Sequence, residues 1–432
     1  MITVVEIMGR NAGWLTAAAA LAGAKGNGAD LIYLPEVDFD MNSFLEKVRD
    51  IYDRNGKCIV AVSEGIHDKD GKYIAVGSKK DIEKYVNSST VIKNATFAMP
   101  GATESHGHWI LEQAFKMGCY TPETRSSGRA STFEEILDDV KAYRKDHPEL
   151  TSIFGYGWSS TKQGIPTLQM IDEAFPDIPV FIAESSLHGA WLNTACFHAA
   201  GIYDKDPEGV HIERDDKGNF LGIAMDESIS FIRNKVFGAL LNDEQYQEAV
   251  VKTARYLNSF GYTSHYDTWS NFDGTSKMYE AIHNADKDKN NPLNFLYASA
   301  YCINSYEKNK ASEMIQTAVN LQKKYTSNHY KPSYIKLFAD GVCEGGTGYV
   351  SFPYKTETFG YGTRIWEPST MNSIVSESNR NGLKVHIHTM GDKAVSEAVD
   401  AFINSYDENG YYRNSIAHVA LCSQEDFMRI KK

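Results

Sequence analysis

Residues 97–108 read Phe-Ala-Met-Pro-Gly-Ala-Thr-Glu-Ser-His-Gly-His, and this stretch decides how the chain is interpreted. A short apolar run reaches Pro100 and Gly101, and two histidines follow at positions i and i+2. On a β-strand this spacing puts both imidazoles on one face, where they can share a cation, most often zinc. We therefore expect His106 and His108 to begin a metal site at a strand end. The alternative is a surface histidine pair beside a turn.

Three later segments have the same character. They are Tyr-Ile-Lys-Leu-Phe-Ala-Asp-Gly (334–341), Lys-Val-His-Ile-His-Thr-Met-Gly-Asp (384–392) and Asn-Ser-Ile-Ala-His-Val-Ala-Leu (414–421). Each places a candidate, Lys336, His388 or His418, at or near the C-terminal end of a predicted strand. In a (β/α)8 barrel these strand ends share one face, where side chains are catalytic rather than structural. The alternative for Lys336 is a surface lysine whose stem packs on apolar neighbours.

Residues 71–432 resemble the amidohydrolase superfamily, and most of all amidohydrolase family 3, which includes N-substituted formamide deformylases. The resemblance is carried by several motifs in order: Tyr73–Ser78, Pro100-Gly101 with His106-Gly-His108, Leu187-His-Gly-Ala-Trp-Leu-Asn193, Gly341 with the upstream Lys336, His388-Thr-Met-Gly-Asp392, and Arg413 with His418. It implies an α/β fold with a metal-dependent hydrolase barrel over residues 100–432. A small β-domain segment at 69–99 would precede the barrel, and an insertion at about 118–230 would interrupt it.

The resemblance also implies roles for the candidate residues. His106 and His108 would hold a first divalent ion, which we expect to be zinc. Lys336 would be carboxylated and bridge to a second ion, and His388 and His418 would complete that position; the resemblance leaves one or two ions open. A divalent ion lowers the pKa of its bound water to about 7, and the resulting hydroxide would attack an amide-type C–N bond of a small molecule.

Residues 187–193 look like the lip of a substrate pocket, which makes His188 and Trp191 candidate substrate contacts. Family members usually carry Asp-Gly-His-Ser here, whereas this chain has Ser-Leu-His-Gly. A core or capping histidine is the alternative reading of His188.

The chain departs from the family at its end. Family members carry an aspartate on the eighth barrel strand that exchanges protons with the metal-bound water. Here the sequence stops about one helix past His418, so we expect an incomplete barrel of strands one to six. The general base is therefore unassigned, since Asp340, Asp392 and Asp426 are not at a matching position.

Residues 1–68 follow a different pattern. Strand-like runs at Val4–Arg10, Leu31–Leu34 and Cys58–Val62 alternate with predicted helices at Asn11–Ala24 and Met41–Arg54. This β-α-β-α-β order predicts a parallel sheet fragment.

Residues 1–70 resemble phosphofructokinases, especially the pyrophosphate-dependent kind, through Met8-Gly-Arg-Asn-Ala-Gly-Trp14, Leu34-Pro-Glu36 and Val62-Ser-Glu-Gly65. The resemblance implies that Met8, Gly9, Arg10 and Glu36 contact fructose 6-phosphate. The donor loop and the catalytic aspartate precede this segment in the family, so we expect no kinase activity. A sheet fragment without a ligand is the alternative.

Two incomplete halves leave three hypotheses open. The first is that the chain is a metal-dependent C–N hydrolase, which is either active or inactive in this truncated form. The second is that it retains a remnant that binds fructose 6-phosphate. The third is that it is an inactive chimera. Our interpretation is that it combines pieces of two genes.

Composition excludes other classes of function. The formal charge of −12 argues against nucleic-acid and anionic-membrane partners. No apolar run reaches the roughly 18 residues of a membrane span, and no basic leader begins the chain. Scattered cysteines without a CxxC pair suit the cytoplasm, and a homo-oligomer is compatible with the sequence.

Periodicity predicts the remaining elements of the barrel and the insertion. The expected helices are Leu111–Met117, Phe133–Tyr143 and Thr167–Phe175, and the expected strands are Pro179–Ile182, Leu257–Thr263 and Phe295–Ala300.

Overall fold

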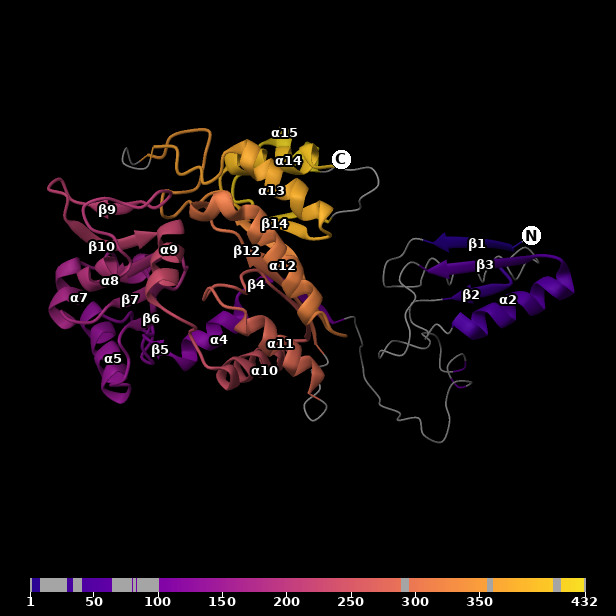
Figure 1. Ribbon diagram of the computed structural model, residues 1–432, viewed down its shortest axis with the longest axis horizontal. Helices are drawn as coiled ribbons and strands as arrows, with labels where there is room; N and C mark the ends of the chain where they lie inside the picture. Colours follow the sequence, from indigo (N-terminus) through magenta and orange to yellow (C-terminus); the bar gives the residue numbers. More distant parts are fainter. Residues whose placement is uncertain are drawn as a thin grey trace. The chain divides into compact units, whose positions relative to one another are not determined.

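The computed structural model describes residues 2–7, 29–33, 41–63, 80, 83, 101–288, 295–355, 360–406 and 413–430. The chain divides into two compact units, Met1–Ala98 and Met99–Lys432, and each is considered by itself (Figure 1). The segment predicted as a small β-domain, 69–99, lies outside the described residues except for positions 80 and 83. No helix within the described ranges is long and apolar enough to cross a membrane.

Among its described residues, the first unit has a three-stranded parallel sheet and one long helix. The strands are β1 (Ile2–Ile7), β2 (Leu31–Tyr33) and β3 (Cys58–Ser63), in the order β1-β3-β2, and the helix is α2 (Met41–Asn55). The helix forms because Phe44, Val48 and Ile51 recur at helical spacing and pack together with Leu31 and the buried Cys58. The predicted parallel sheet and second helix are confirmed. The predicted first helix, Asn11–Ala24, lies outside the described residues.

The second unit is built around a six-stranded parallel sheet, here called the barrel sheet. Its strands, in spatial order, are β15 (Ser415–His418), β14 (Lys384–Thr389), β13 (Tyr330–Phe338), β12 (Leu296–Cys302), β11 (Tyr262–Asp267) and β4 (Ala102–Gly107). Parallel strands need crossover connections, and helices supply them. The helices that follow β4, β11, β12, β13, β14 and β15 are α4 (Trp109–Met117), α11 (Lys277–Lys287), α12 (Ala311–Tyr325), α13 (Pro368–Arg380), α14 (Asp392–Asn404) and α15 (Gln424–Ile430). An additional helix, α10 (Asp243–Ser259), precedes β11.

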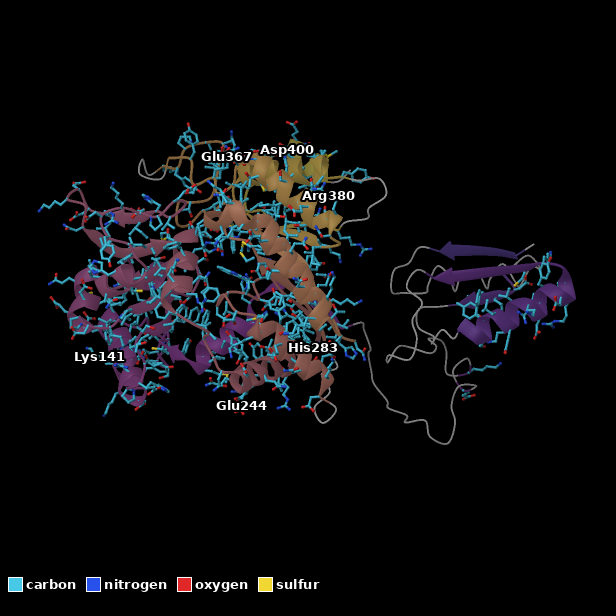
Figure 2. All side chains as sticks on the ribbon, viewed as in Figure 1. Lys141, Glu244, His283, Glu367, Arg380 and Asp400 are labelled. Carbon is cyan, nitrogen blue, oxygen red and sulfur yellow. The ribbon has the colours of Figure 1, made fainter. Side chains whose placement is uncertain are left out.

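The two faces of the barrel sheet differ in chemistry. On β13, Ile335 and Leu337 are fully buried and belong to the same core cluster as Met371, Ile374 and Val375 of α13. The alternate residue Lys336 therefore faces away from this helix layer, because successive side chains of a strand point to opposite faces. Charged residues such as Glu244, Arg380 and Asp400 lie on the outside of the helices (Figure 2).

A second sheet, here called the insertion sheet, lies between β4 and α10 in the sequence. Its strands, in spatial order, are β5 (Cys119–Tyr120), β6 (Ile153–Trp158), β7 (Val180–Glu184), β8 (Gly189–Leu192), β10 (Phe220–Met225) and β9 (Ile212–Arg214). The pairs from β5 to β7 are parallel, and the remaining pairs are antiparallel. Its helices are α5 (Phe133–Asp146), α6 (Ser160–Gln163), α7 (Leu168–Ala174), α8 (Thr194–Ala199) and α9 (Glu227–Val236). Figure 1 shows these elements, in purple and magenta, beside the part of the chain that carries the orange strand β12.

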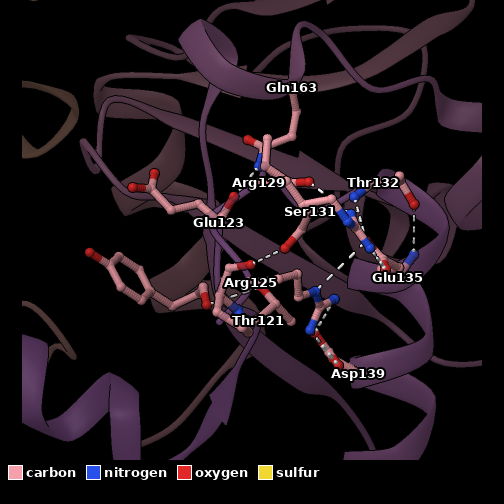
Figure 3. A network of polar contacts seen from close by, with 12 residues as sticks. Thr121, Glu123, Arg125, Arg129, Ser131, Thr132, Glu135, Asp139 and Gln163 are labelled. Carbon is pink, nitrogen blue, oxygen red and sulfur yellow. Dashed lines mark hydrogen bonds and ion pairs between the residues drawn. The ribbon is translucent and has the colours of Figure 1, made fainter. Parts of the chain in front are cut away.

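A polar network fixes the start of α5 (Figure 3). The Thr132 hydroxyl accepts the Glu135 backbone N–H at 3.3 Å, while the Glu135 carboxylate accepts the Thr132 N–H at 2.9 Å. This reciprocal capping box satisfies two of the helix's unpaired donors. Arg129 donates to Glu135 at 2.9 Å, and Arg125 pairs with Asp139 at 2.9 Å. The loop before α5 is therefore tied to the first turns of the helix.

One predicted strand is partly wrong. We expected a strand over Leu257–Thr263, but α10 continues to Ser259 and β11 begins only at Tyr262. Leu257 is 2% exposed and lies on the buried stripe of α10. Gly261, with φ +85°, permits the left-handed turn that separates helix from strand. The other predicted helices and strands of the second unit are present with ends shifted by a few residues.

Candidate active site

The carboxyl ends of the barrel strands bring the predicted reactive side chains together. Strand β4 supplies His106, β13 supplies Lys336, β14 supplies His388 and β15 supplies His418. In the register of the sheet, Lys336 pairs with His386, and Thr389 pairs with His418. Because all six strands are parallel, these residues lie at the same end of the sheet.

The imidazoles form one continuous cluster. The ring centroids of His388 and His418 are 4.4 Å apart, those of His106 and His418 are 4.8 Å apart, and those of His106 and His108 are 5.7 Å apart. His106 is on one edge strand of the sheet and His418 is on the other. The sheet therefore curves until its two edges approach each other at this end.

The backbone at His418 is unusual. His418 and the following Val419 have φ values of +72° and +47°, a region that costs non-glycine residues about 1–3 kcal/mol. For the β-branched Val419 this conformation is a clear outlier. The strain occurs where the His418 ring joins the imidazole cluster.

Lys336 is the most informative member of the site. Its side chain is fully buried, and its Nζ has no hydrogen-bond partner among the residues that the structure describes. The Nζ lies 4.7 Å from the centroid of the Phe338 ring. Burial lowers the pKa of Lys336 to about 7, because desolvation disfavours the ammonium form. A neutral amine can react with carbon dioxide, and the resulting carbamate would be an anionic oxygen ligand.

The imidazoles are neutral at pH 7. Burial, assisted by Lys336, lowers the pKa of His386 to about 2 and the pKa of His418 to about 4. Burial also lowers the pKa of His108 to about 4 and holds those of His106 and His388 well below their ordinary value. Neutral imidazole is the form that binds a metal.

The donor set fits a divalent cation chemically, although the rings are turned toward hydrogen-bond partners. The described residues contain no group of three or more His, Cys, Asp or Glu side chains already arranged to hold a metal ion. His106 Nδ1 lies 2.8 Å from His386 Nε2, and His388 Nε2 lies 2.9 Å from the Gly341 carbonyl oxygen. Because a carbonyl only accepts, His388 Nε2 carries the proton and Nδ1 keeps its lone pair. Within the described part of the chain, the buried His108 Nδ1 also lacks a partner.

Three buried residues at this end were missed by the sequence analysis: His265, Asp267 and His386. His265 Nε2 is 3.8 Å from Asp267 Oδ2, and both side chains are fully buried. Burial by itself would raise the pKa of Asp267, but the neighbouring His265 and His108 outweigh burial and hold this pKa below its usual range. His265 also packs against the His-Gly-His turn, since a Cβ at Gly107 would lie 3.0 Å from its Cε1.

A small pocket adjoins the imidazole cluster. Its lining comes from helix α9, from Phe338 at the end of β13 and from loops beside both sheets: Leu187, His188, Asp226, Glu227, Ser230, Trp269, Phe338, Asp340 and Ile365. His188 Nδ1 lies 2.8 Å from Asp226 Oδ1, and the ring centroid of His188 is 5.2 Å from that of His388. Leu187 and Asp226 have φ values of +62° and +47°, so the backbone on both sides of this pair is strained.

Trp191, the other predicted substrate contact, lies elsewhere. Its side chain is fully buried in the core of the insertion, where its indole N–H donates to the Thr167 carbonyl at 3.0 Å. Its ring meets Phe133 edge to face at 5.4 Å between centroids. The structure thus brings His188 to the imidazole cluster and not Trp191.

The three aspartates without a sequence assignment make structural contacts. Asp340 accepts backbone N–H groups of Tyr349, Met390 and Gly391 at 2.7–2.9 Å, and burial raises its pKa to about 6. Asp392 accepts the Ser351 N–H at 2.8 Å, and Asp426 pairs with Arg429 at 2.8 Å. The predicted sugar-phosphate contacts, Met8, Gly9, Arg10 and Glu36, lie outside the described residues.

Comparison with known proteins shows to which family the chain belongs. Residues 96–432 match the Amidohydrolase family, and residues 1–108 match the Phosphofructokinase family. The chain belongs to the amidohydrolase family, and its opening segment is phosphofructokinase-like.

Among relatives, the exoenzymes regulatory protein AepA of Pectobacterium carotovorum subsp. carotovorum is 25% identical over 365 residues, which cover 81% of this chain and 74% of AepA. The putative amidohydrolase YtcJ of Bacillus subtilis is 23% identical, covering 84% of this chain and 66% of its own length. For the opening segment, the pyrophosphate–fructose 6-phosphate 1-phosphotransferase of Rhodospirillum rubrum is 51% identical over 79 residues, 18% of this chain and 20% of the relative.

Solved structures support the fold. An uncharacterized metal-dependent hydrolase from Pyrococcus horikoshii aligns with a TM-score of 0.53 at 21% identity, covering 77% of this chain and 61% of that one. A second uncharacterized metal-dependent hydrolase, from Pyrococcus furiosus, aligns with a TM-score of 0.50 at 18% identity, covering 93% and 70%. The chain thus spans roughly two thirds of the length of these relatives.

Proposed function

We propose that the second unit hydrolyses amide-type C–N bonds of small molecules with the help of one or two divalent ions, zinc being the first candidate. The observation that carries the proposal is Lys336, buried without a partner among the described residues beside neutral imidazoles, in a chain of the amidohydrolase family. A bound divalent ion would lower the pKa of its water to about 7 and polarise the substrate carbonyl.

Each side chain then has a defined task. His106 and His108 would hold the first ion, and Lys336, as its carbamate, would supply a further oxygen ligand together with His388 and His418. These imidazoles suit the task because burial keeps them neutral at pH 7, so that each ring has one nitrogen with a free lone pair. His188 is held through its Nδ1 by Asp226, which leaves the other ring nitrogen for the substrate. The general base stays unassigned.

A reconstitution assay tests the proposal. The protein is stripped with a chelator, reloaded with Zn²⁺, Co²⁺ or Mn²⁺ in bicarbonate buffer, and given a panel of N-substituted formamides and acetamides. We expect turnover of at least one amide that disappears with chelator and returns with metal. His106→Ala is expected to abolish it, whereas His211→Ala, on a side chain that is 83% exposed, keeps it. Turnover that survives both chelation and His106→Ala would overturn the proposal.

A second candidate function concerns the first unit, and the 51% identity to a pyrophosphate-dependent phosphotransferase favours it. We propose that Met8, Gly9, Arg10 and Glu36 contact fructose 6-phosphate. A ligand that binds only the native state raises its stability, so fructose 6-phosphate should raise the melting temperature of the full chain. Arg10→Ala should remove this shift. An equal shift with and without Arg10 would contradict the assignment.

A further inference from the structure

His386 is a buried imidazole that the proposed metal site does not use. It precedes His388 by two residues on β14, so the two side chains leave the strand on the same face. Its Nε2 lies 2.8 Å from His106 Nδ1, and its Nδ1 lies 2.7 Å from the Ser415 hydroxyl. The side chain is 4% exposed. Three side chains from β4, β14 and β15 therefore form one hydrogen-bonded chain.

Only two proton arrangements satisfy this chain. A neutral imidazole carries one N–H, and a hydrogen bond between two ring nitrogens needs one donor and one acceptor. In the first arrangement, His106 Nδ1–H donates to His386 Nε2, and His386 Nδ1–H donates to Ser415. In the second, the Ser415 hydroxyl donates to His386 Nδ1, and His386 Nε2–H donates to His106 Nδ1. Each ring is neutral in either arrangement, because the accepting ring nitrogen carries no proton and an imidazole that binds a cation needs a free lone pair.

The two arrangements differ in what His106 can do. In the first, the His106 proton is on Nδ1, and its Nε2 lone pair is available to a cation. In the second, Nε2 carries the proton and cannot bind a cation, while Nδ1 is occupied by the hydrogen bond. Metal-binding histidines almost always donate their second ring N–H to an acceptor, which fixes the tautomer and raises the basicity of the ligand.

We propose that Ser415 and His386 form a relay that holds His106 in the tautomer whose Nε2 binds the metal, so that His386 is a positioning residue rather than a ligand. The inference rests on the proposed function, because it assigns a tautomer to one of the proposed ligands. It makes His386 and Ser415 determinants of metal affinity without contact to the ion.

Substitutions of His386 separate this role from packing. His386→Gln keeps an acceptor, since the amide oxygen can take the place of Nε2. His386→Leu fills a similar space without any polar atom. Ser415→Ala removes only the far end of the relay, and Ser373→Ala, on an exposed hydroxyl that bonds within its own helix, is the matched control. Thermal unfolding of each variant identifies those that fold.

The measurement is the zinc dissociation constant, obtained in competition with a chromophoric chelator. We expect His386→Leu to weaken zinc binding about 10–100-fold, the range for loss of a partner that orients a ligand. His386→Gln should stay within a few fold of the parent, Ser415→Ala should fall between them, and Ser373→Ala should bind as the parent does. If His386→Leu does not fold, Ser415→Ala against Ser373→Ala decides the same question.

Each remaining outcome has one meaning. A parent that binds no zinc overturns both the proposed function and this inference. A parent that binds zinc while His386→Leu or Ser415→Ala bind it equally well overturns the inference alone. Equal losses in His386→Gln and His386→Leu also overturn it, because packing would then explain the effect. In the zinc-bound parent, ¹⁵N spectra should show a protonated Nδ1 on His106, and a protonated Nε2 would refute the relay.

Discussion

The barrel sheet and the insertion sheet differ most clearly in whether their buried polar groups have hydrogen-bond partners. Asn193, at the end of β8, is fully buried and completely paired. Its amide accepts from Val180 N and Cys196 N and donates to the Phe175 and Ile178 carbonyls. Lys336, at the end of β13, is as deeply buried, and its Nζ is unpaired within the described residues.

This contrast distinguishes buried polar groups that stabilise the fold from buried polar groups that serve binding or catalysis. A buried polar group left without a partner costs about 1–3 kcal/mol, so a fold does not keep it for stability. In the part of the chain that is described, unpaired buried atoms gather at one end of the barrel sheet: His108 Nδ1, both ring nitrogens of His265, the Tyr266 hydroxyl, Asp267 Oδ2 and Lys336 Nζ. In the insertion, the atoms without a hydrogen bond, Arg125 Nε, Asp139 Oδ2 and Arg233 Nε, belong to side chains that bond through their other atoms or in ion pairs. Local features that work against stability are expected where a protein binds or reacts. The difference predicts opposite results for matched substitutions in the two sheets.

The largest effect is expected for Lys336→Met. Turnover should fall about a thousandfold, since loss of metal-derived stabilisation amounts to several kcal/mol. The unfolding free energy of the metal-free protein at pH 7 should rise, by about 1–4 kcal/mol, because an apolar chain replaces a buried ionisable group. Lys384→Met, at the opposite end of β14, is the control and should leave turnover unchanged. If Lys336→Met keeps its turnover, or is less stable than the parent, the contrast between the two sheets is contradicted.

Next in size is Trp191→Ala in the insertion. Removal of a fully buried indole should lower the unfolding free energy by about 3–5 kcal/mol, as measured by denaturant titration. The folded fraction should keep its KM, because Trp191 is not among the residues that line the pocket. A large rise in KM at unchanged stability would instead make Trp191 a substrate contact.

Lys336 also predicts a pH dependence for the metal-free protein. Its pKa is lowered from 10.5 when unfolded to about 7 when folded. Between pH 7 and 10.5 the unfolded state therefore binds more protons, so stability rises with pH, by up to about 1.4 kcal/mol per unit. Below pH 7 both states are protonated and this contribution is flat. Urea titrations of parent and Lys336→Met, in chelator and carbon dioxide-free buffer, should diverge in this sense; parallel curves would contradict it.

The smallest effect is expected for the capping box of α5. Thr132→Ala should lower the unfolding free energy by about 1 kcal/mol, because the Glu135 N–H loses its acceptor. Thr132→Ser keeps the hydroxyl and should be close to neutral. Metal binding should be the same in both variants. A change in zinc affinity with Thr132→Ala would show that the insertion and the metal site are coupled.

The sequence predicted much of this arrangement through spacing. The i, i+2 histidines at 106 and 108, and the alternation around Lys336 and His388, identified the strand ends that meet. The same i, i+2 rule also applies to His386 and His388, and it would have found His386. Other features were beyond spacing. Every residue of β8 is buried, so the strand has no alternation of polar and apolar positions that would show whether Trp191 faces the core or a pocket. Asp267 belongs to the site only through burial beside His265, a property of tertiary packing.

The most direct test of the account is a crystal structure of the full chain grown with zinc, with diffraction data collected on both sides of the zinc absorption edge. The account predicts one or two anomalous peaks within bonding distance of His106, His108, Lys336, His388 and His418, with density for a carboxylated Lys336 if two peaks are present. An imidazole cluster without an anomalous peak, in crystals that hold zinc elsewhere, would contradict it.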